Sequence, residues 1–267
     1  MWLLFKSYCE QGGLFLTVEL LQGWQDWPLG LTQQPELLRR LEGGLTNKSY
    51  LIDIEGTQIV LRVNSPNSSA LGINRQHEKI ILEKVSNLGV CPEVYHVDVA
   101  NGICLSQFVG ENYWEDITAQ LASKRQRLLA TLNKVHNVEC ELPTRDYRHY
   151  INHYWQEILA LDIKLADEIY REREFLLTVV DEFSSQPAVL THHDLVTSNV
   201  IDSESQLYIL DWEYAAMGQA EFDMASLIRE WNLSIQDLHG LEYRRDKLDV
   251  ALRLYDHIYQ LWYFLQG

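Results

Sequence analysis

The sequence lacks the cysteine patterns of a zinc site or of a disulfide framework. Its 4 cysteines are scattered over 267 residues. None of them forms a Cys-x-x-Cys pair or a close cluster with histidine, so we expect no structural zinc. Isolated cysteines in a chain of this length are typical of reduced thiols, which favours the cytoplasm.

Long apolar runs are also missing. No run approaches the roughly 18 residues that a membrane-spanning helix needs. The first residues are apolar, but Lys6 interrupts them and no basic segment precedes them, so we expect no signal peptide. The 6 prolines and 14 glycines are too few for a collagen-like or low-complexity chain. These absences predict a cytoplasmic protein that does not act in a membrane.

Positive charge is scarce. The chain has 22 Lys and Arg residues against 38 Asp and Glu residues, which gives a formal net charge of −16. A field of this sign opposes binding to phosphate backbones, so nucleic acid is not an expected partner. A cationic ligand fits better, although solubility alone accounts for the acidity of many proteins.

Two hairpins are predicted in the first part of the chain. Residues 50–54 and 58–63 are β-rich runs joined across Glu55-Gly56, and residues 94–98 and 103–109 flank Asn101-Gly102. Between the hairpins, Asn74 is a candidate cap for a helix that runs to Leu88 and stops at Gly89. Before them, Leu37, Leu38 and Leu41 predict a short helix.

The pattern changes after Gly110. Residues 114–138, 147–183 and about 222 to the end have helical periodicity, and short β-like segments lie between 187 and 211. We therefore expect an α+β fold with a strand-rich N-terminal lobe, residues 1–110, and a mostly helical C-terminal lobe, residues 111–267.

One motif carries the chemistry. His192, Asp194 and Asn199 have the spacing of the catalytic loop of protein kinases. Two short strands follow, 200–202 and 207–210, and a hairpin between them would bring Asp211 beside Asn199. An amide oxygen and a carboxylate suit Mg²⁺. Asp194 would then be free to orient an incoming hydroxyl.

Phosphoryl transfer also needs groups that hold ATP. Arg62, on the second strand of the first hairpin, is the candidate cationic clamp, and Glu78 could pair with it and fix its direction. The turn with Gly44 and Asn47 would cover the phosphates with backbone N–H groups.

Taken together, the motifs resemble the aminoglycoside phosphotransferase and choline kinase family, which is related to the protein kinases. The elements are Gly43-Gly44-Leu45-Thr46-Asn47, Val60-Leu61-Arg62, Arg75-Gln76-His77-Glu78, Ser106 to Gly110, the His192 motif and Ile209-Leu210-Asp211-Trp212-Glu213-Tyr214-Ala215. The resemblance implies a bilobal protein-kinase-like fold that transfers the γ-phosphoryl group of ATP, with Mg²⁺, to a small-molecule hydroxyl. It also implies a hinge in which Gln107 and Val109 meet adenine through backbone groups.

Two departures from protein kinases point toward small-molecule substrates. Arg62 stands where protein kinases have lysine, and Trp212-Glu213 replaces Phe-Gly after the metal aspartate. A P-loop fold is excluded because no Gly-x4-Gly-Lys motif is present.

Residues downstream of Asp211 indicate the kind of acceptor. Family members that act on choline carry Glu-Trp downstream of the metal aspartate, as in Glu230-Trp231 here, and Glu213 and Tyr214 could complete an acidic aromatic pocket. Such a pocket attracts a cation by cation–π contact. The resemblance favours choline or a related amino alcohol, with thiamine and an aminoglycoside as alternatives. An inactive nucleotide-binding module and a protein kinase are the competing hypotheses of other kinds.

Several of these residues also have a structural interpretation. His192 is expected to tie its loop to neighbouring backbone, and Trp231 could equally belong to the core. Glu213 could support the metal or be solvated, and Arg62 with Glu78 could be a surface pair. The C-terminal aromatics Tyr255, Tyr259, Trp262 and Tyr263 have helical spacing and are predicted to pack.

Overall fold

The chain divides into two compact units. The computed structural model describes residues 21, 23–42, 46–111, 113–114, 121–185, 187–203 and 206–266. Unit 1 comprises residues 1–66 and 92–109, and unit 2 comprises residues 67–91 and 110–267. The sequence placed residues 67–91 in the N-terminal lobe, whereas their contacts group them with the helical part.

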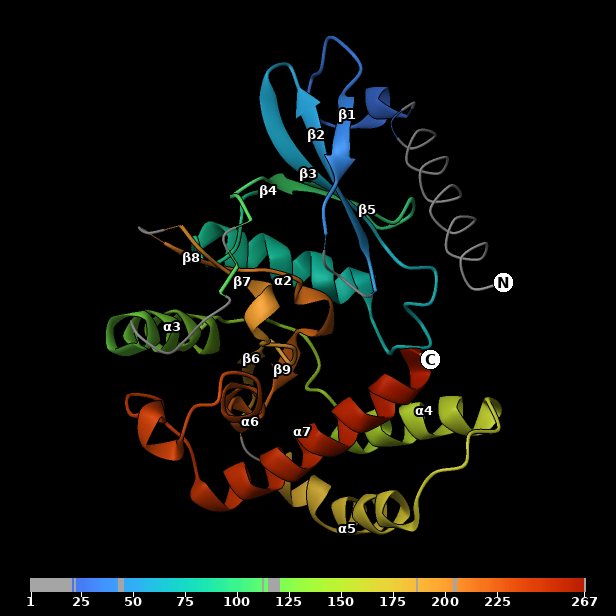
Figure 1. Cartoon of the computed structure of the whole chain (residues 1–267), viewed down its shortest axis with the longest axis vertical. Helices are drawn as coiled ribbons and strands as arrows, with labels where there is room; N and C mark the ends of the chain where they lie inside the picture. The colour runs from blue at the N-terminus through green and yellow to red at the C-terminus, as the bar shows by residue number, and fades with distance from the viewer. Residues whose placement is uncertain are drawn as a thin grey trace. The chain divides into compact units, whose positions relative to one another are not determined.

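Unit 1 is built on one antiparallel sheet (Figure 1). Its strands follow the order β1-β2-β3-β5-β4. Their bounds are Glu36–Arg40 for β1, Lys48–Ile54 for β2, Thr57–Val63 for β3, Val94–Asp98 for β4 and Ile103–Gln107 for β5, and a short 3-10 helix η1, Trp24–Asp26, precedes them. Both predicted hairpins are therefore confirmed.

The β2–β3 hairpin shows why these residues form a turn. Glu55 and Gly56 both have positive φ, 52° and 86°, which matches the tight turn that suits twisted strands. The Asp53 carboxylate accepts the Gly56 N–H at 2.8 Å. Alternation along the strands sends Ile52 and Leu61 into the core of the unit.

The short helix expected around Leu37 is wrong. Residues Glu36–Arg40 form the edge strand β1, which pairs with β2 and has an irregular register between Leu37 and Arg39. Leu37 packs on the core and Leu38 is 40% exposed, so the run alternates as a strand does. Pairing with an existing strand outweighs the weak local preference of a five-residue segment.

Unit 2 contains the long helices. They are α2 (Arg75–Asn87), α3 (Leu121–His136), α4 (Tyr147–Ala160), α5 (Asp167–Phe183), α6 (Ala220–Glu230) and α7 (Arg245–Gln266). Two small sheets pair β6 (Val189–Thr191) with β9 (Ala216–Gly218) and β7 (Val200–Asp202) with β8 (Leu207–Ile209). Three 3-10 helices are η2 (Thr197–Asn199), η3 (Trp212–Tyr214) and η4 (Ile235–Leu238).

Helix α2 begins where its sequence predicts. The Asn74 side chain accepts the N–H groups of Gln76 and His77, both at 3.1 Å, and Gly89 follows the helix with a φ of 65°. The loop before it is held by α4, because the Tyr154 hydroxyl donates to the Leu71 carbonyl at 3.1 Å. This contact explains why α2 belongs to unit 2.

The core of unit 2 lies among α4, α5, α6 and α7, and α7 packs on the other three (Figure 1). Large aromatic side chains fill it, and those of Tyr147, Tyr154, Phe183 and Phe222 are fully buried. Removing each such side chain from water contributes roughly 1.5–3 kcal/mol, so this cluster supplies much of the unit's stability. Among the described residues, no helix combines the length and apolarity needed to cross a bilayer.

Candidate active site

A buried aspartate holds the loop that carries the kinase-like motif. Asp223, on α6, accepts the backbone N–H groups of His192 and His193 at 3.0 and 2.9 Å and is fully buried. His136, on α3, places its Nε2 3.0 Å from the same carboxylate. Sequence analysis missed both roles, because no local spacing connects α3, α6 and the loop.

The two histidines of the motif are structural, as expected of His192. Its Nε2–H donates to the Leu210 carbonyl at 2.9 Å, and its Nδ1 accepts the Asp194 N–H at 3.3 Å. His193 has a φ of 66°, and its ring nitrogens contact the Thr191 carbonyl and the Tyr147 hydroxyl. The loop is thus fixed at the two residues that directly precede Asp194.

Asp194, Asn199 and Asp211 come together through the β7–β8 hairpin. The Asn199 side-chain amide donates to the Asp194 carboxylate at 2.9 Å and to its carbonyl at 3.0 Å. The hairpin returns the chain, and the Leu210 N–H donates to the Asn199 carbonyl at 2.7 Å. Asp211 follows directly, so the structure brings these residues onto neighbouring stretches of backbone.

Asp194 lies in an acidic environment. Burial, together with nearby Glu213 and Glu230, raises the pKa of Asp194 to about 7, and the hydrogen bond from Asn199 opposes this shift. A carboxylate whose pKa is near neutrality is suited to accept a proton from a hydroxyl.

Glu213 is buried and does not face solvent. It forms an ion pair with Arg75 of α2 at 2.9 Å, and the same Arg75 nitrogen lies 2.8 Å from Glu78. Sequence analysis paired Glu78 with Arg62 instead. Arg62 belongs to unit 1, and that pairing stays a prediction.

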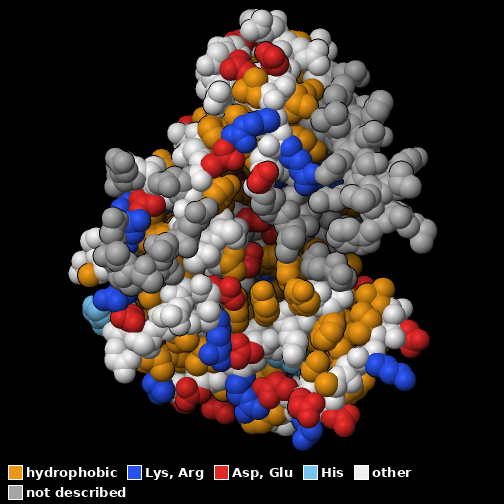
Figure 2. Space-filling view, viewed as in Figure 1, with side chains coloured by type: hydrophobic (Ala, Val, Ile, Leu, Met, Phe, Trp, Pro, Cys, Tyr) orange, Lys and Arg blue, Asp and Glu red, His pale blue; other side chains and the backbone are white. Residues whose placement is uncertain are grey.

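A row of aromatic side chains extends along α7 beside this acidic environment. Tyr255 donates its hydroxyl to Glu230 at 3.0 Å, and Trp262 donates its ring N–H to the Tyr214 hydroxyl at 3.0 Å. Tyr259 stacks on both Tyr255 and Trp262 with ring centroids 6.2 Å apart, and it is 47% exposed. Figure 2 shows hydrophobic side chains gathered over α4 and the C-terminal half of α7. These aromatic side chains were predicted only to pack, but their hydrogen bonds and ring stacking also form a continuous set of contacts from Glu230 to Tyr214.

Trp231 has a structural position, in contrast to the pocket role expected from the Glu-Trp pattern. Its side chain is 2% exposed, its ring N–H donates to the Leu195 carbonyl at 2.7 Å, and its ring meets Trp114 edge-on at 5.1 Å. The neighbouring carboxylate, Glu230, is the member of the pair that reaches the aromatic row.

The comparisons with known proteins agree with this geometry. The profile of the choline/ethanolamine kinase family matches residues 38–251. The chain belongs to the choline/ethanolamine kinase family. It is 28% identical over 199 residues to the protein LicA of Haemophilus influenzae, an alignment that covers 72% of this chain and 58% of that protein.

Solved structures give the same fold. The choline kinase LicA of Streptococcus pneumoniae aligns with a TM-score of 0.75 at 23% identity, covering 93% of this chain and 90% of the other. The aminoglycoside phosphotransferase APH(4)-Ia aligns with a TM-score of 0.66 at 16% identity, covering 93% and 89%. The expected bilobal protein-kinase-like fold and the family resemblance are confirmed, and by family the chain is a kinase.

Family membership implies a metal ion, and the oxygen donors here fit magnesium. Asn199 turns its amide NH₂ toward Asp194, and among the described residues its Oδ1 has no hydrogen-bond partner. That oxygen and the Asp211 carboxylate make two hard donors. The described residues contain no cluster of three or more His, Cys, Asp or Glu side chains arranged as a metal site. Two protein ligands match Mg²⁺, which takes its remaining ligands from water and phosphate.

The residues predicted to hold ATP lie mostly in unit 1. Asn47 is buried, and its side-chain oxygen accepts the Ser65 N–H at 3.2 Å. Arg62 lies on β3 opposite Cys104, and Gln107 ends β5, where its N–H donates to the Glu93 carbonyl at 2.8 Å. Gly44 lies outside the described residues. The nucleotide-binding roles of these residues, and of Val109, remain predictions.

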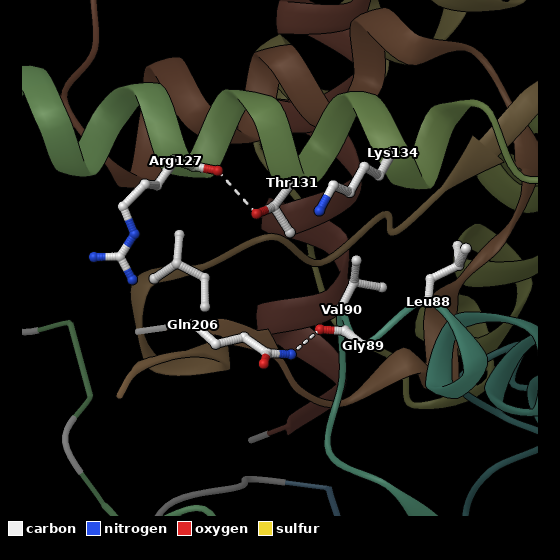
Figure 3. Close-up of a pocket in the computed structure, with 8 residues that line it drawn as sticks. Leu88, Gly89, Val90, Arg127, Thr131, Lys134 and Gln206 are labelled. Carbon is white, nitrogen blue, oxygen red and sulfur yellow. Dashed lines mark hydrogen bonds between the residues drawn. The ribbon is translucent and has the colours of Figure 1, made fainter. Parts of the chain in front are cut away.

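A separate cavity of about 420 Å³ opens in unit 2 (Figure 3). Side chains of α3, among them Arg127, Thr131 and Lys134, line one wall, and Gln206 on the other donates to the Gly89 carbonyl. None of the predicted site residues lines this cavity. The Arg127 side chain is paired with Asp202 at 2.8 Å. Because the cavity contains none of the residues expected to carry out phosphoryl transfer, we assign it no part in that reaction.

Proposed function

We propose that this protein transfers the γ-phosphoryl group of ATP to the hydroxyl group of a small cationic alcohol, with choline or a related amino alcohol favoured. One observation carries the proposal. Asp194, held by Asn199 beside Asp211, shares its surroundings with Glu230 and with the aromatic row of α7, in which Tyr259 is exposed. Asp194 would then orient the hydroxyl group of the substrate, while Glu230 and the aromatic row would bind the cationic group of the same molecule.

Asp194 is proposed to accept the proton of the attacking hydroxyl and to orient its oxygen. The short loop around Asp194 is held by Asp223 and His192, so the carboxylate is positioned before substrate binds. Asn199 and Asp211 would hold Mg²⁺, which neutralises charge on the phosphates when it is bound.

The acceptor surface is proposed to consist of Glu230, Tyr214, Tyr255, Tyr259 and Trp262. Each well-placed ring contributes about 0.5–2 kcal/mol to binding a quaternary ammonium group. Glu230 adds a charge complementary to the substrate. Because thiamine is also cationic and aromatic, it is the second acceptor to be tested.

The proposed nucleotide contacts are those predicted from sequence. Arg62 would be the clamp on the phosphates, with Glu78 as its partner, and Gly44 and Asn47 would cover them. Gln107 and Val109 would contact the adenine. The cytoplasm, where ATP is abundant, remains the predicted compartment.

A substrate panel tests the proposal. Purified protein with Mg²⁺ and ATP is assayed for ADP release with choline, ethanolamine, thiamine and kanamycin. We expect the highest kcat/KM with choline or another amino alcohol. Turnover with none of these alcohols, by protein that binds ATP in a thermal-shift assay, would support an inactive nucleotide-binding module instead. Label transferred to peptides would support a protein kinase.

A single substitution tests the proposed acceptor surface. Tyr259→Leu removes an exposed ring that stacks on two neighbours, so we expect the KM for choline to rise about 3- to 30-fold, the equivalent of one cation–π contact. The matched control is Tyr170→Leu, on α5, which removes a ring of similar exposure, 42%. Equal KM values for choline in both variants would remove Tyr259 from the acceptor surface.

A further inference from the structure

We propose that Arg75 is a positioning residue for the phosphoryl transfer: it binds Glu78 and Glu213 together and thereby fixes the segment that carries Asp211. The inference rests on the proposed function. It concerns a residue of α2 that is outside the catalytic motif.

The contacts join two elements that are far apart in sequence. Arg75 Nη1 lies 2.8 Å from Glu78 Oε2 on its own helix and 2.9 Å from Glu213 Oε2 on η3. The other guanidinium nitrogens, Nε and Nη2, donate to Ser68 Oγ at 3.1 and 2.9 Å. One planar group therefore connects the loop before α2, the helix itself and η3.

The ion pairs of Arg75 are buried, and this burial makes the arginine side chain difficult to replace. The side chains of Arg75, Glu78 and Glu213 are 10%, 2% and 1% exposed. Two carboxylates at such depth need a cation and hydrogen-bond donors, since an unpaired buried charge is strongly unfavourable. The guanidinium provides several donors in a fixed plane, which an ammonium group cannot copy.

The segment bound by Arg75 is the one that carries the proposed metal ligand. Glu213 follows Asp211 by two residues in η3. A second residue of η3 is also held in place: the ring N–H of Trp212 donates to the Ile209 carbonyl at 3.0 Å, and its ring packs edge-on against His192. The contacts of Glu213 with Arg75 and of Trp212 with Ile209 and His192 both restrain η3, which leaves the Asp211 backbone little freedom.

Arg75→Lys is the primary test. Lysine keeps the positive charge but cannot reach Ser68 and both carboxylates at once. With choline, or the best alcohol of the panel, we expect kcat to fall about 10-fold or more and KM for the alcohol to change less than about 2-fold, the pattern of lost transition-state positioning. The Mg²⁺ concentration for half-maximal rate should rise at least about 3-fold.

A binding measurement separates this inference from the proposed function. Mn²⁺ replaces Mg²⁺ as the probe, and bound Mn²⁺ is counted by electron paramagnetic resonance with ATP present. The variant should bind Mn²⁺ more weakly even if no alcohol of the panel is phosphorylated by the wild-type protein. In that case the proposed function fails while the positioning role of Arg75 stands.

The matched control is Arg148→Lys. Arg148 makes a two-point ion pair with Asp181 on the surface of the same unit, with distances of 2.9 and 2.8 Å. The substitution makes the same chemical change at an ion pair between α4 and α5 that does not include η3, so kcat and Mn²⁺ binding should equal those of the wild-type protein.

Two results would overturn the inference. The first is a folded Arg75→Lys variant whose kcat and Mn²⁺ affinity lie within about 2-fold of the wild-type values. The second applies if that variant does not fold. Arg75→Met is then added to Glu213→Gln, and a further loss in kcat of more than about 3-fold beyond Glu213→Gln alone would show that Arg75 does not act through Glu213.

Discussion

Asp194 and Asp223 are two aspartates of one unit, and their surroundings give them opposite properties. Burial and the nearby carboxylates Glu213 and Glu230 raise the pKa of Asp194 to about 7. Burial also acts to raise the pKa of Asp223, but the hydrogen bond and charge of His136 outweigh it, and the pKa lies below its ordinary value. Burial alone does not decide the state of a carboxylate.

The two pKa values differ because the two carboxylates have different hydrogen-bond donors and different charged neighbours. Asp223 accepts two backbone N–H groups and contacts His136, so its charge is stabilised where it is. Asp194 has the side chain of Asn199 as a donor and carboxylates around it. The contacts of Asp223 hold the loop in place, and the surroundings of Asp194 give the proposed catalytic carboxylate on that loop a pKa of about 7.

The largest expected effect is on turnover of Asp194→Asn. The amide keeps the size of the side chain but cannot accept the hydroxyl proton, so kcat should fall about 10²- to 10⁴-fold. ATP affinity should stay nearly constant because the change is confined to the acceptor side. ADP release and a thermal-shift titration with ATP measure the two quantities, and a kcat within about 2-fold of the wild-type value would remove Asp194 from catalysis.

The main expected effect of Asp223→Ala is a loss of folding stability. The substitution leaves the N–H groups of His192 and His193 buried without an acceptor, so the free energy of unfolding should fall by about 3–5 kcal/mol. Urea titration followed by circular dichroism measures the loss. The comparison between the two aspartates fails if Asp194→Asn destabilises the protein as much as Asp223→Ala does.

The stability of the metal-free protein should depend on pH through Asp194. Its pKa is about 7 in the folded state and near its ordinary value of 3.8 when unfolded. The folded state therefore binds more protons between these values, and the contribution of Asp194 is full below pH 3.8 and is lost as pH rises toward 7. Urea titrations in EDTA should show that Asp194→Asn gains stability relative to the wild-type protein over this window. A constant difference between the two proteins would contradict the raised pKa.

The smallest expected effect concerns a buried histidine without a role in the site. His257, on α7, is 2% exposed, and neither ring nitrogen has a hydrogen-bond partner among the described residues. Burial lowers its pKa to about 4, so its contribution to stability is lost as pH falls from 6.5 toward 4. His257→Leu should raise the free energy of unfolding at pH 7 by about 1–2 kcal/mol, because it removes an unsatisfied polar group. A melting temperature below that of the wild-type protein would show that the ring has a partner after all.

Local sequence patterns determined several secondary-structure elements of this protein and part of its candidate site. Alternation and turn residues predicted both hairpins of unit 1, and Asn74 with Gly89 predicted the ends of α2, because these signals act within a few residues. The spacing of His192, Asp194 and Asn199, followed by a short hairpin, predicted which residues meet around Asp211. The short β7–β8 hairpin returns the chain, so local connectivity brings those residues close to one another.

Tertiary structure decided the rest. The pairing partner of Leu37 made its segment a strand, and packing placed Trp231 in the core while it brought Tyr255 and Tyr259 to Glu230. Asp223 and Arg75 received their roles from elements that are distant in sequence. Their ion pairs and hydrogen bonds depend on burial and on donors contributed by other helices, and no periodicity or spacing in a single sequence encodes those distances.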